Sequence, residues 1–231
     1  MNTYLLPHLG MGDYLIVNGL IRNIIKRAPN KDFILMVNNK HSVSIPFMFR
    51  DIKNLKFCFV PPIEMNEKTI KPYIKDFIYE LILIGYNNMD YITPSDMMFY
   101  KQFGVDFNKR WTDFYIERDS KKEKELFDKF NIKDNEYIFL HEGGSNNDCF
   151  IDRTKIKSNL KVVSPEKGLT ENIFDYCYII EHAAEIHVIE SSFLFLIDSI
   201  LTNGKLYAHR YARSLVNYTI PHLKKDWRIL K

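Results

Sequence analysis

Short, continuous apolar runs alternate with amphipathic runs along most of this chain. In the first half, apolar runs predict strands over residues 3–7, 32–38, 55–61 and 80–86. Because these runs lack regular polar alternation, they are typical of strands buried on both faces of a parallel sheet. Between the first two runs, apolar residues recur at helical spacing over residues 14–27, which predicts an amphipathic helix.

The pattern changes in the middle of the chain and then restarts. Residues 106–130 are dense in charge, and residues 120–130 are expected to form a solvated helix. We therefore place a domain junction within residues 108–120 and expect one domain over residues 1–112 and another over residues 113–231. Downstream, the apolar pattern predicts strands over residues 137–143, 160–165, 185–191 and 205–211, and helices over residues 171–184 and 192–202.

These two successive series of strands and helices predict the fold class. A repeated strand–helix–strand series forms a parallel sheet with helices packed on its faces. We therefore expect an α/β protein with two small Rossmann-like parallel-sheet domains that face each other across a cleft. The helix expected over residues 192–202 is apolar nearly all round, which predicts that it is deeply buried.

Net charge, cysteine spacing and the length of the apolar runs indicate which partners and which cellular compartment to expect. The formal net charge of +3 is too small to indicate a nucleic-acid partner, but it suits a local pocket that binds phosphate. The three cysteines are far apart and lack metal-binding spacing, which favours a reducing compartment. Asp13 interrupts the apolar N-terminal run, and no apolar run reaches the length of a membrane span. We therefore expect a cytoplasmic protein without a signal peptide or a membrane span.

The first candidate site is the turn after the first predicted strand, because ligands of open parallel sheets bind beyond the carboxyl ends of the strands. Gly10 and Gly12 allow a tight turn and a close approach of the backbone to a ligand. Asp13 follows at the start of the predicted helix, where a carboxylate either caps the helix or takes part in chemistry. The spacing alone favours neither role for Asp13.

The second candidate site is the polar segment that follows the strand predicted over residues 137–143. Gly143, Gly144 and Ser145 offer backbone N–H groups and a hydroxyl to an anion. Arg153 or Lys155 supplies a positive charge for the same phosphate. The structural alternative is a flexible polar surface loop.

The third candidate site lies at the end of the strand predicted over residues 185–191. Glu190 is an acid between apolar runs, and such a carboxylate suits the hydroxyl pair of a ribose or another sugar. Ser191 and Ser192 either contribute to this site or simply cap the next helix.

The fourth candidate site follows the last predicted strand. His209, Arg210 and Arg213 cluster there, and guanidinium groups at a strand end suit a diphosphate. Solvated surface residues are the alternative. His187 stands inside an apolar strand and is interpreted as a core histidine.

Several well-known motifs do not occur in the sequence. It has no Asp-x-Asp, which weakens a metal-dependent sugar-nucleotide site, and no GxGxxG, P-loop, GxSxG or HExxH motif. We therefore predict neither a metal site nor a bound cofactor.

Taken together, the candidate segments resemble the GT-B fold glycosyltransferases, particularly the heptosyltransferase group of family 9, in a shortened form. The segment "GMGDYLIVNGLIRNI" resembles the family's early turn and helix, in which an aspartate is taken as the general base and maps onto Asp13. The segment "LHEGGSNNDCFIDR" resembles its donor-phosphate loop, with Ser145 and Arg153 as the matching residues. In "IIEHAAEIHVIESSFLFLID", Glu190 replaces the family's aspartate and Ser191 matches its serine.

The resemblance implies an inverting, metal-independent glycosyltransferase. A nucleotide-sugar would be the donor substrate and a glycan hydroxyl, as in surface-glycan biosynthesis, the acceptor. The donor diphosphate would be held by Ser145 and Arg153 together with Arg210 or Arg213, while Asp13 would deprotonate the acceptor. The alternatives are a sugar-nucleotide epimerase and a non-catalytic module that binds a glycan or a nucleotide or serves in an assembly. The sequence does not indicate the sugar, the nucleotide base or the oligomeric state.

Overall fold

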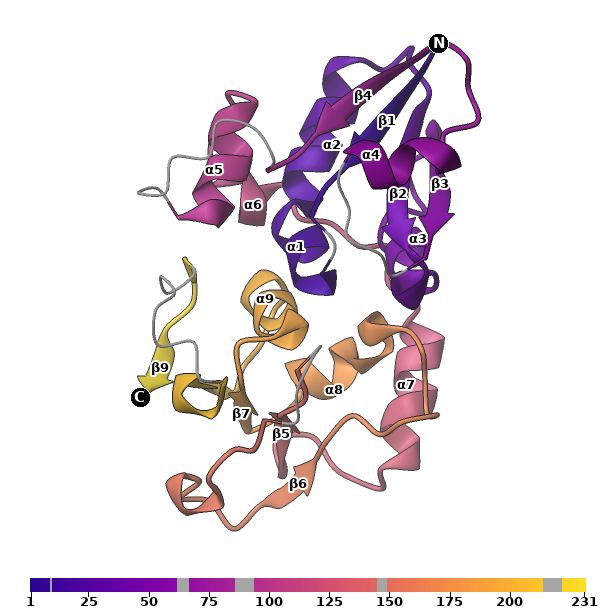
Figure 1. Cartoon of the computed structure of the whole chain (residues 1–231). Coiled ribbons are helices and arrows are strands. Elements are labelled where there is room, and N and C mark those ends of the chain that lie inside the picture. Colours follow the sequence, from indigo (N-terminus) through magenta and orange to yellow (C-terminus); the bar gives the residue numbers. More distant parts are fainter. Residues whose placement is uncertain (9, 62–66, 86–93, 145–148, 214–221) are drawn as a thin grey trace. The chain divides into compact units, whose positions relative to one another are not determined.

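The computed structural model describes residues 1–8, 10–61, 67–85, 94–144, 149–213 and 222–231 (Figure 1). The chain divides into two compact units, an N-terminal unit, Met1–Glu117, and a C-terminal unit, Arg118–Lys231. Each unit contains one parallel sheet within its described residues, which confirms the predicted α/β class.

Four strands of the N-terminal unit form a sheet in the order β3-β2-β1-β4. They are β1 (Asn2–Leu6), β2 (Phe33–Asn38), β3 (Leu55–Val60) and β4 (Tyr79–Leu83). The helical elements are α1 (Met11–Ile16), α2 (Asn18–Arg27), η1 (Asn39–His41), α3 (Ser44–Met48), α4 (Glu67–Ile70), η2 (Lys71–Tyr73), α5 (Ser95–Gln102) and α6 (Lys109–Thr112). The apolar runs predicted all four strands to within a few residues.

Apolar packing covers the two faces of this sheet. Tyr4, Leu6 and Met36 form one face and pack against Ile70 of α4, while α2 lies on the other side in Figure 1. The hydroxyl of the buried Tyr14 donates to the carbonyl oxygen of Met36 at 2.5 Å, which joins α1 to β2. Buried polar groups of this kind need such a partner, because an unpaired hydroxyl would destabilise the core.

A clamp on α2 holds the segment that ends the N-terminal unit. The side-chain amide of Asn18 accepts from the backbone N–H of Tyr115 at 3.1 Å and donates to its carbonyl oxygen at 3.2 Å. Arg22 donates to the same carbonyl oxygen at 2.8 Å. A β-carbon on Gly19 would lie 2.1 Å from the carbonyl oxygen of Lys109, so only glycine allows this approach. Residues 113–117, which we expected in the second domain, are thereby attached to the first sheet's helices.

Five strands of the C-terminal unit form a sheet in the order β6-β5-β7-β8-β9. They are β5 (Tyr137–His141), β6 (Lys161–Val163), β7 (Glu185–Val188), β8 (Lys205–His209) and β9 (Trp227–Leu230). The helical elements are α7 (Ser120–Lys129), η3 (Arg153–Lys155), η4 (Ile173–Tyr176), α8 (Cys177–Glu181), α9 (Ser192–Ser199) and η5 (Arg210–Arg213). The deep burial predicted for the helix after β7 is confirmed, since Phe193, Leu194, Leu196 and Ile197 of α9 are buried.

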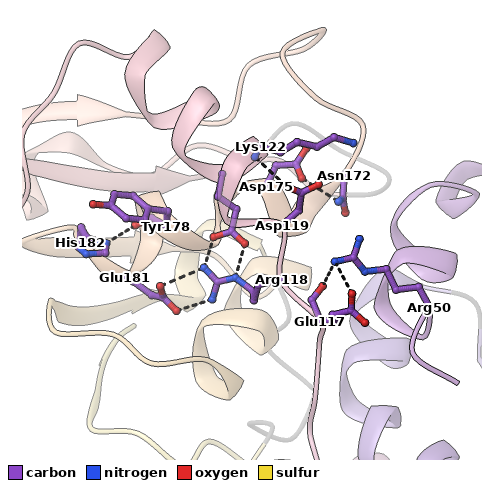
Figure 2. A network of polar contacts seen from close by, with 11 residues as sticks. Arg50, Glu117, Arg118, Asp119, Lys122, Asn172, Asp175, Tyr178, Glu181 and His182 are labelled. Atoms are coloured by element: carbon purple, nitrogen blue, oxygen red, sulfur yellow. Dashed lines mark hydrogen bonds and ion pairs between the residues drawn. The ribbon is translucent and has the colours of Figure 1, made fainter.

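The charged helix α7 is not fully solvated, because one face packs on α8. Arg118, just before α7, pairs with both Glu123 of α7 and Glu181 of α8 (Figure 2). Its Nη1 lies 2.7 Å from Oε1 of Glu181, and its contacts with Glu123 include Nε to Oε1 at 2.5 Å. Asp119 caps the helix by accepting from the N–H of Lys122 at 3.1 Å. Leu126 and Phe127 are buried on the same helix, so α7 is amphipathic.

Two helical predictions need correction. The helix expected over residues 14–27 begins earlier, at Met11, and is divided into α1 and α2 at Val17. The helix expected over residues 171–184 is a short 3₁₀ turn followed by α8. Strand β9 was not predicted, because its apolar run is short, contains Arg228 and directly follows the charged residues Lys224, Lys225 and Asp226.

The buried carboxylate of Asp198 anchors β9 to the rest of the C-terminal sheet. It accepts from the backbone N–H groups of Lys224 and Lys225, at 3.0 and 3.1 Å, and from the indole N–H of Trp227 at 3.0 Å. Lys225 donates to the carbonyl oxygen of Ile197 at 2.6 Å. Burial lowers the pKa of Lys225 to about 8. Asp198 therefore fixes the start of β9 through hydrogen bonds from a helix that lies about 30 residues earlier in the chain.

We expect Asp198→Ala to destabilise the C-terminal unit by about 2–4 kcal/mol, because three donors, including the buried indole N–H of Trp227, lose their acceptor. Asp198→Asn, which keeps one oxygen, should cost less. Urea unfolding followed by far-ultraviolet circular dichroism and by tryptophan fluorescence, to which Trp227 contributes from the C-terminal unit and Trp111 from the N-terminal unit, measures both. Asp226→Ala removes an exposed carboxylate beside the same strand and is the matched control. Equal losses in Asp198→Ala and Asp226→Ala would show that Asp198 does not anchor β9.

Candidate active site

The turn between β1 and α1 holds Asp13 at the third position of the helix. The backbone N–H of Gly10 donates to Oδ2 of Asp13 at 3.1 Å. A β-carbon on Gly10 would lie 2.9 Å from that oxygen, so the carboxylate occupies the space of a side chain. Asp13 therefore caps α1 from inside its first turn. Gly12 lies within α1 and not in the turn, contrary to expectation.

The environment of Asp13 raises the pKa of its carboxyl group. The side chain is half-buried, and burial raises the pKa of its carboxyl group, while the charge of His8 and the N–H of Gly10 act in the opposite direction. His8 closely follows β1, and its Nε2 lies 2.8 Å from the carbonyl oxygen of Gly85, which follows β4. A carboxylate with a raised pKa is a stronger proton acceptor than an exposed one, as a general base requires.

Sequence reasoning missed His8 and Gly85. Gly85 has φ +85°, and a β-carbon there would lie 2.4 Å from the ring of Phe99 and 2.9 Å from that of His8. Glycine is therefore required at this position by both conformation and space. His8 stands close to Gly10 in the sequence, which could have marked it as part of the turn. Its partner Gly85 lies 77 residues away and could not be inferred from the local sequence.

In the C-terminal unit, Ser191 is coupled to a histidine that the sequence did not indicate. Its Oγ lies 3.1 Å from Nδ1 of His141, at the carboxyl end of β5. Ser191 occupies the position before α9, but among the described residues its hydroxyl makes no capping bond to that helix. The ring of His141 packs on Phe193 with centroids 4.4 Å apart, and burial lowers the pKa of His141 to about 4. His141 is therefore neutral at physiological pH.

Two predicted phosphate-binding arginines have carboxylate partners. Arg153 Nη2 lies 2.6 Å from Oε1 of Glu142, whose other oxygen accepts from the N–H of Ile151 at 2.8 Å. Arg210 Nε lies 3.2 Å from Oε2 of Glu190, and both of these side chains are mostly buried. Both arginines thus stand beside the carboxyl edge of the sheet with their charges balanced. Glu190, which we expected to bind sugar hydroxyls, instead faces a guanidinium.

His209 does not reach outward as a phosphate ligand would. Its side chain is fully buried, with Nε2 2.9 Å from Nδ1 of His187 and Nδ1 2.9 Å from the hydroxyl of Tyr211. His187 is buried too, which confirms its interpretation as a core histidine, and its Nε2 lies 3.4 Å from Glu185. The hydroxyl of Tyr211 accepts from the N–H of Asp152 at 2.9 Å. His209 therefore supports the segment before Arg153 through Tyr211, and its buried ring does not face a ligand.

Four predicted site residues remain, namely Gly144, Ser145, Ser192 and Arg213. Ser192 is the first residue of α9 and is half-buried, and Gly144 follows β5 and is half-buried. Arg213 ends η5, and Ser145 lies outside the described residues. Over the described ranges, no group of three or more histidine, cysteine, aspartate or glutamate side chains is placed to hold a metal ion. No described helix is long and apolar enough to span a membrane.

We expect the C-terminal unit to lose stability as the pH falls from about 6.5 to about 4. Burial lowers the pKa of His141 to about 4, and burial with the nearby His187 does the same for His209. The unfolded chain takes up these protons near pH 6.5, whereas the folded chain resists them until about pH 4. Each imidazole should cost on the order of 1–2 kcal/mol over this range, after allowance for solvent screening. Thermal midpoints measured at pH 7 and pH 5 test this.

His141→Gln and His209→Gln should each reduce the difference between those two midpoints. His222→Gln, at a half-buried histidine elsewhere in the chain, serves as the control. A pH dependence that is unchanged in both test variants would contradict the assignment of this acid sensitivity to His141 and His209.

No family model and no curated protein matches this sequence. Solved structures, in contrast, share its fold. The structure of E. coli ADP-heptose LPS heptosyltransferase II aligns over 100% of this chain and 90% of its own, with a TM-score of 0.60 and 11% identity. A glycosyl transferase family 9 protein from Veillonella parvula aligns over 90% of this chain and 80% of its own, with a TM-score of 0.59 and 10% identity.

E. coli heptosyltransferase WaaC, solved with ADP-2-deoxy-2-fluoro heptose, aligns over 100% of this chain and 93% of its own, with a TM-score of 0.53 and 9% identity. At identities this low, the similarity establishes the fold and not the chemistry. The chain therefore has the two-sheet α/β fold found in family 9 glycosyltransferases, which confirms the GT-B-like fold predicted from its sequence.

Proposed function

We propose that this protein is a glycosyltransferase that moves a sugar from a nucleotide-sugar donor to a hydroxyl group of a glycan acceptor. The half-buried carboxyl group of Asp13 carries this proposal, because its raised pKa and its place at the carboxyl edge of the N-terminal sheet suit a general base. The shared fold with proteins solved as heptosyltransferases supports it.

The proposed reaction is an inverting displacement. Asp13 takes the proton of the acceptor hydroxyl as its oxygen forms a bond to the anomeric carbon of the donor. The bond from that carbon to the phosphate oxygen breaks, and the nucleoside diphosphate leaves with the electron pair. The proposal assigns the acceptor to the N-terminal unit and the donor to the C-terminal unit.

The donor side of the proposal rests on Arg153, Arg210 and Ser191. Guanidinium groups stabilise the charge that develops on a leaving diphosphate, a task that a metal ion performs in other transferases. Because Glu142 and Glu190 already hold the two guanidinium groups, these arginines are oriented before the donor arrives. In the proposal a diphosphate contacts the guanidinium groups of Arg153 and Arg210, and Glu190 has the role of orienting Arg210.

We expect Asp13→Asn to lower transfer by about 10²–10⁴-fold while nucleotide binding is retained. The asparagine keeps an oxygen that accepts from the N–H of Gly10, so the loss of stability should stay below about 1 kcal/mol. Product formation with a panel of sugar nucleotides, together with the thermal midpoint, measures both effects. Asp13→Ala removes the capping oxygen as well, and it should add a loss of stability to the same loss of transfer. Full activity in Asp13→Asn would eliminate Asp13 as the base.

We expect nucleoside diphosphates or their sugar conjugates to raise the thermal midpoint of the wild-type protein. Arg210→Gln should weaken this binding about tenfold or more, because it removes a charged donor from the phosphate. Lys205→Gln removes a cation at the opposite end of β8 and is the matched control. A protein that no nucleotide stabilises would exclude the transferase proposal and favour a glycan-binding module without catalytic activity.

A further inference from the structure

Three apolar side chains are exposed at the amino ends of β1 and β4. The exposed fractions are 74% for Met1, 99% for Phe77 and 67% for Ile78. The two strands pair with Asn2 opposite Tyr79, so Met1 and Ile78 both stand just before this pair. We call Met1, Phe77 and Ile78 the apolar tip. Isolated exposed apolar residues are ordinary, but three at the ends of adjacent strands, one of them a fully exposed phenylalanine, indicate an interaction surface.

The apolar tip projects from a well-anchored turn. Asp76, directly before Phe77, accepts from the side-chain amide of Asn2 at 2.9 Å and from the hydroxyl of Tyr4 at 2.6 Å. These bonds lower the pKa of Asp76, which keeps it ionised and bound to β1. Ile74, two residues earlier, packs against the core of the N-terminal unit. Phe77 is therefore held outward, and folding provides it no apolar neighbour that would cover its ring.

Exposed lysines lie around the apolar tip. Lys75 precedes Asp76, and Lys71 begins the 3₁₀ turn that leads to it. Lys56 of β3 is close enough to act electrostatically on Asp76. Asn2 and Tyr4 hold Asp76 in place but leave its negative charge, which Lys56 offsets, and Lys31 at the same end of the sheet pairs with Glu80 at 2.8 Å. Asp32 at the amino end of β2 is a further exposed carboxylate, so the four lysines Lys31, Lys56, Lys71 and Lys75 stand against the three carboxylates of Asp32, Asp76 and Glu80, a small positive excess.

We propose that the apolar tip inserts into the interfacial region of an anionic lipid bilayer while Lys56, Lys71 and Lys75 contact the headgroups. Protruding apolar side chains with neighbouring cations are the features that hold a protein on such a surface without spanning it. Lysine stems extend along apolar surface and keep their ammonium groups at the headgroups. A second protein copy fits less well, because three protruding side chains cover much less than the roughly 800 Å² per partner of a stable interface.

The apolar tip is at the amino edge of the sheet, whereas the turn that holds Asp13 follows the carboxyl end of β1. Substitutions in the tip therefore leave the proposed base in place. The membrane proposal and the transferase proposal are independent, and one can fail without the other.

The test is sedimentation of the full chain with vesicles, using phosphatidylcholine alone or with about one third phosphatidylglycerol. Wild-type protein should pellet with the anionic vesicles, less so at high salt and weakly with neutral vesicles. Phe77→Ser with Ile78→Ser should lower the partition coefficient about tenfold or more. Leu201→Ser removes an apolar residue that is 84% exposed in the C-terminal unit, and it is the matched control.

A second readout reports insertion directly. In Phe77→Trp, the added indole emission should shift to shorter wavelength with anionic vesicles and be quenched by brominated lipid. Unchanged thermal midpoints in both tip variants show that the fold is intact. Equal partition of wild type, the double variant and Leu201→Ser would overturn the proposal. So would sedimentation of the wild-type protein without vesicles that the double variant abolishes, because that result assigns the tip to self-association.

Discussion

Parallel strand pairing is the constraint on which both units depend. A parallel pair cannot be closed by a tight hairpin, so each connection crosses a face of the sheet and covers it with apolar residues. All carboxyl ends then meet at one edge. In the C-terminal unit, the pairing of β5 with β7 places His141 opposite Val188, three residues before Ser191. The contact between His141 and Ser191 follows from this register, although 50 residues separate them in the chain.

Two arginine charges at the edge of the C-terminal sheet are balanced by carboxylates of the same chain. Glu142 and Glu190 each neutralise one arginine, and His141 and His209 are held neutral by burial. If this edge binds the proposed diphosphate, the paired arginines would recognise it through the geometry of their hydrogen bonds more than through total charge. A planar guanidinium fixed by a carboxylate loses little freedom when it meets a phosphate. Its orientation has already been determined during folding.

The sequence predicted features that depend on local composition. The apolar runs located β1 and β5, because both strands are buried on two faces, and the same reasoning identified His187 as a core residue. Features that depend on distant partners were missed. β9 is held by Asp198, about 30 residues earlier, and His209 is buried because His187 lies on the neighbouring strand. No periodicity in a single segment reports which strands become neighbours.

The segment from Gly10 to Arg22 contains residues that pack the N-terminal unit together and one residue, Asp13, that packing does not require. Asn18, Gly19 and Arg22 hold the end of the N-terminal unit against α2, so their spacing reports packing and would persist in a protein without activity. Asp13 differs from them. Its capping bond uses one carboxylate oxygen and an uncharged side chain would satisfy it, yet the charge is kept where burial raises the pKa of the group. Under the proposed function, proton transfer accounts for a carboxylate in a turn where a neutral cap would be enough.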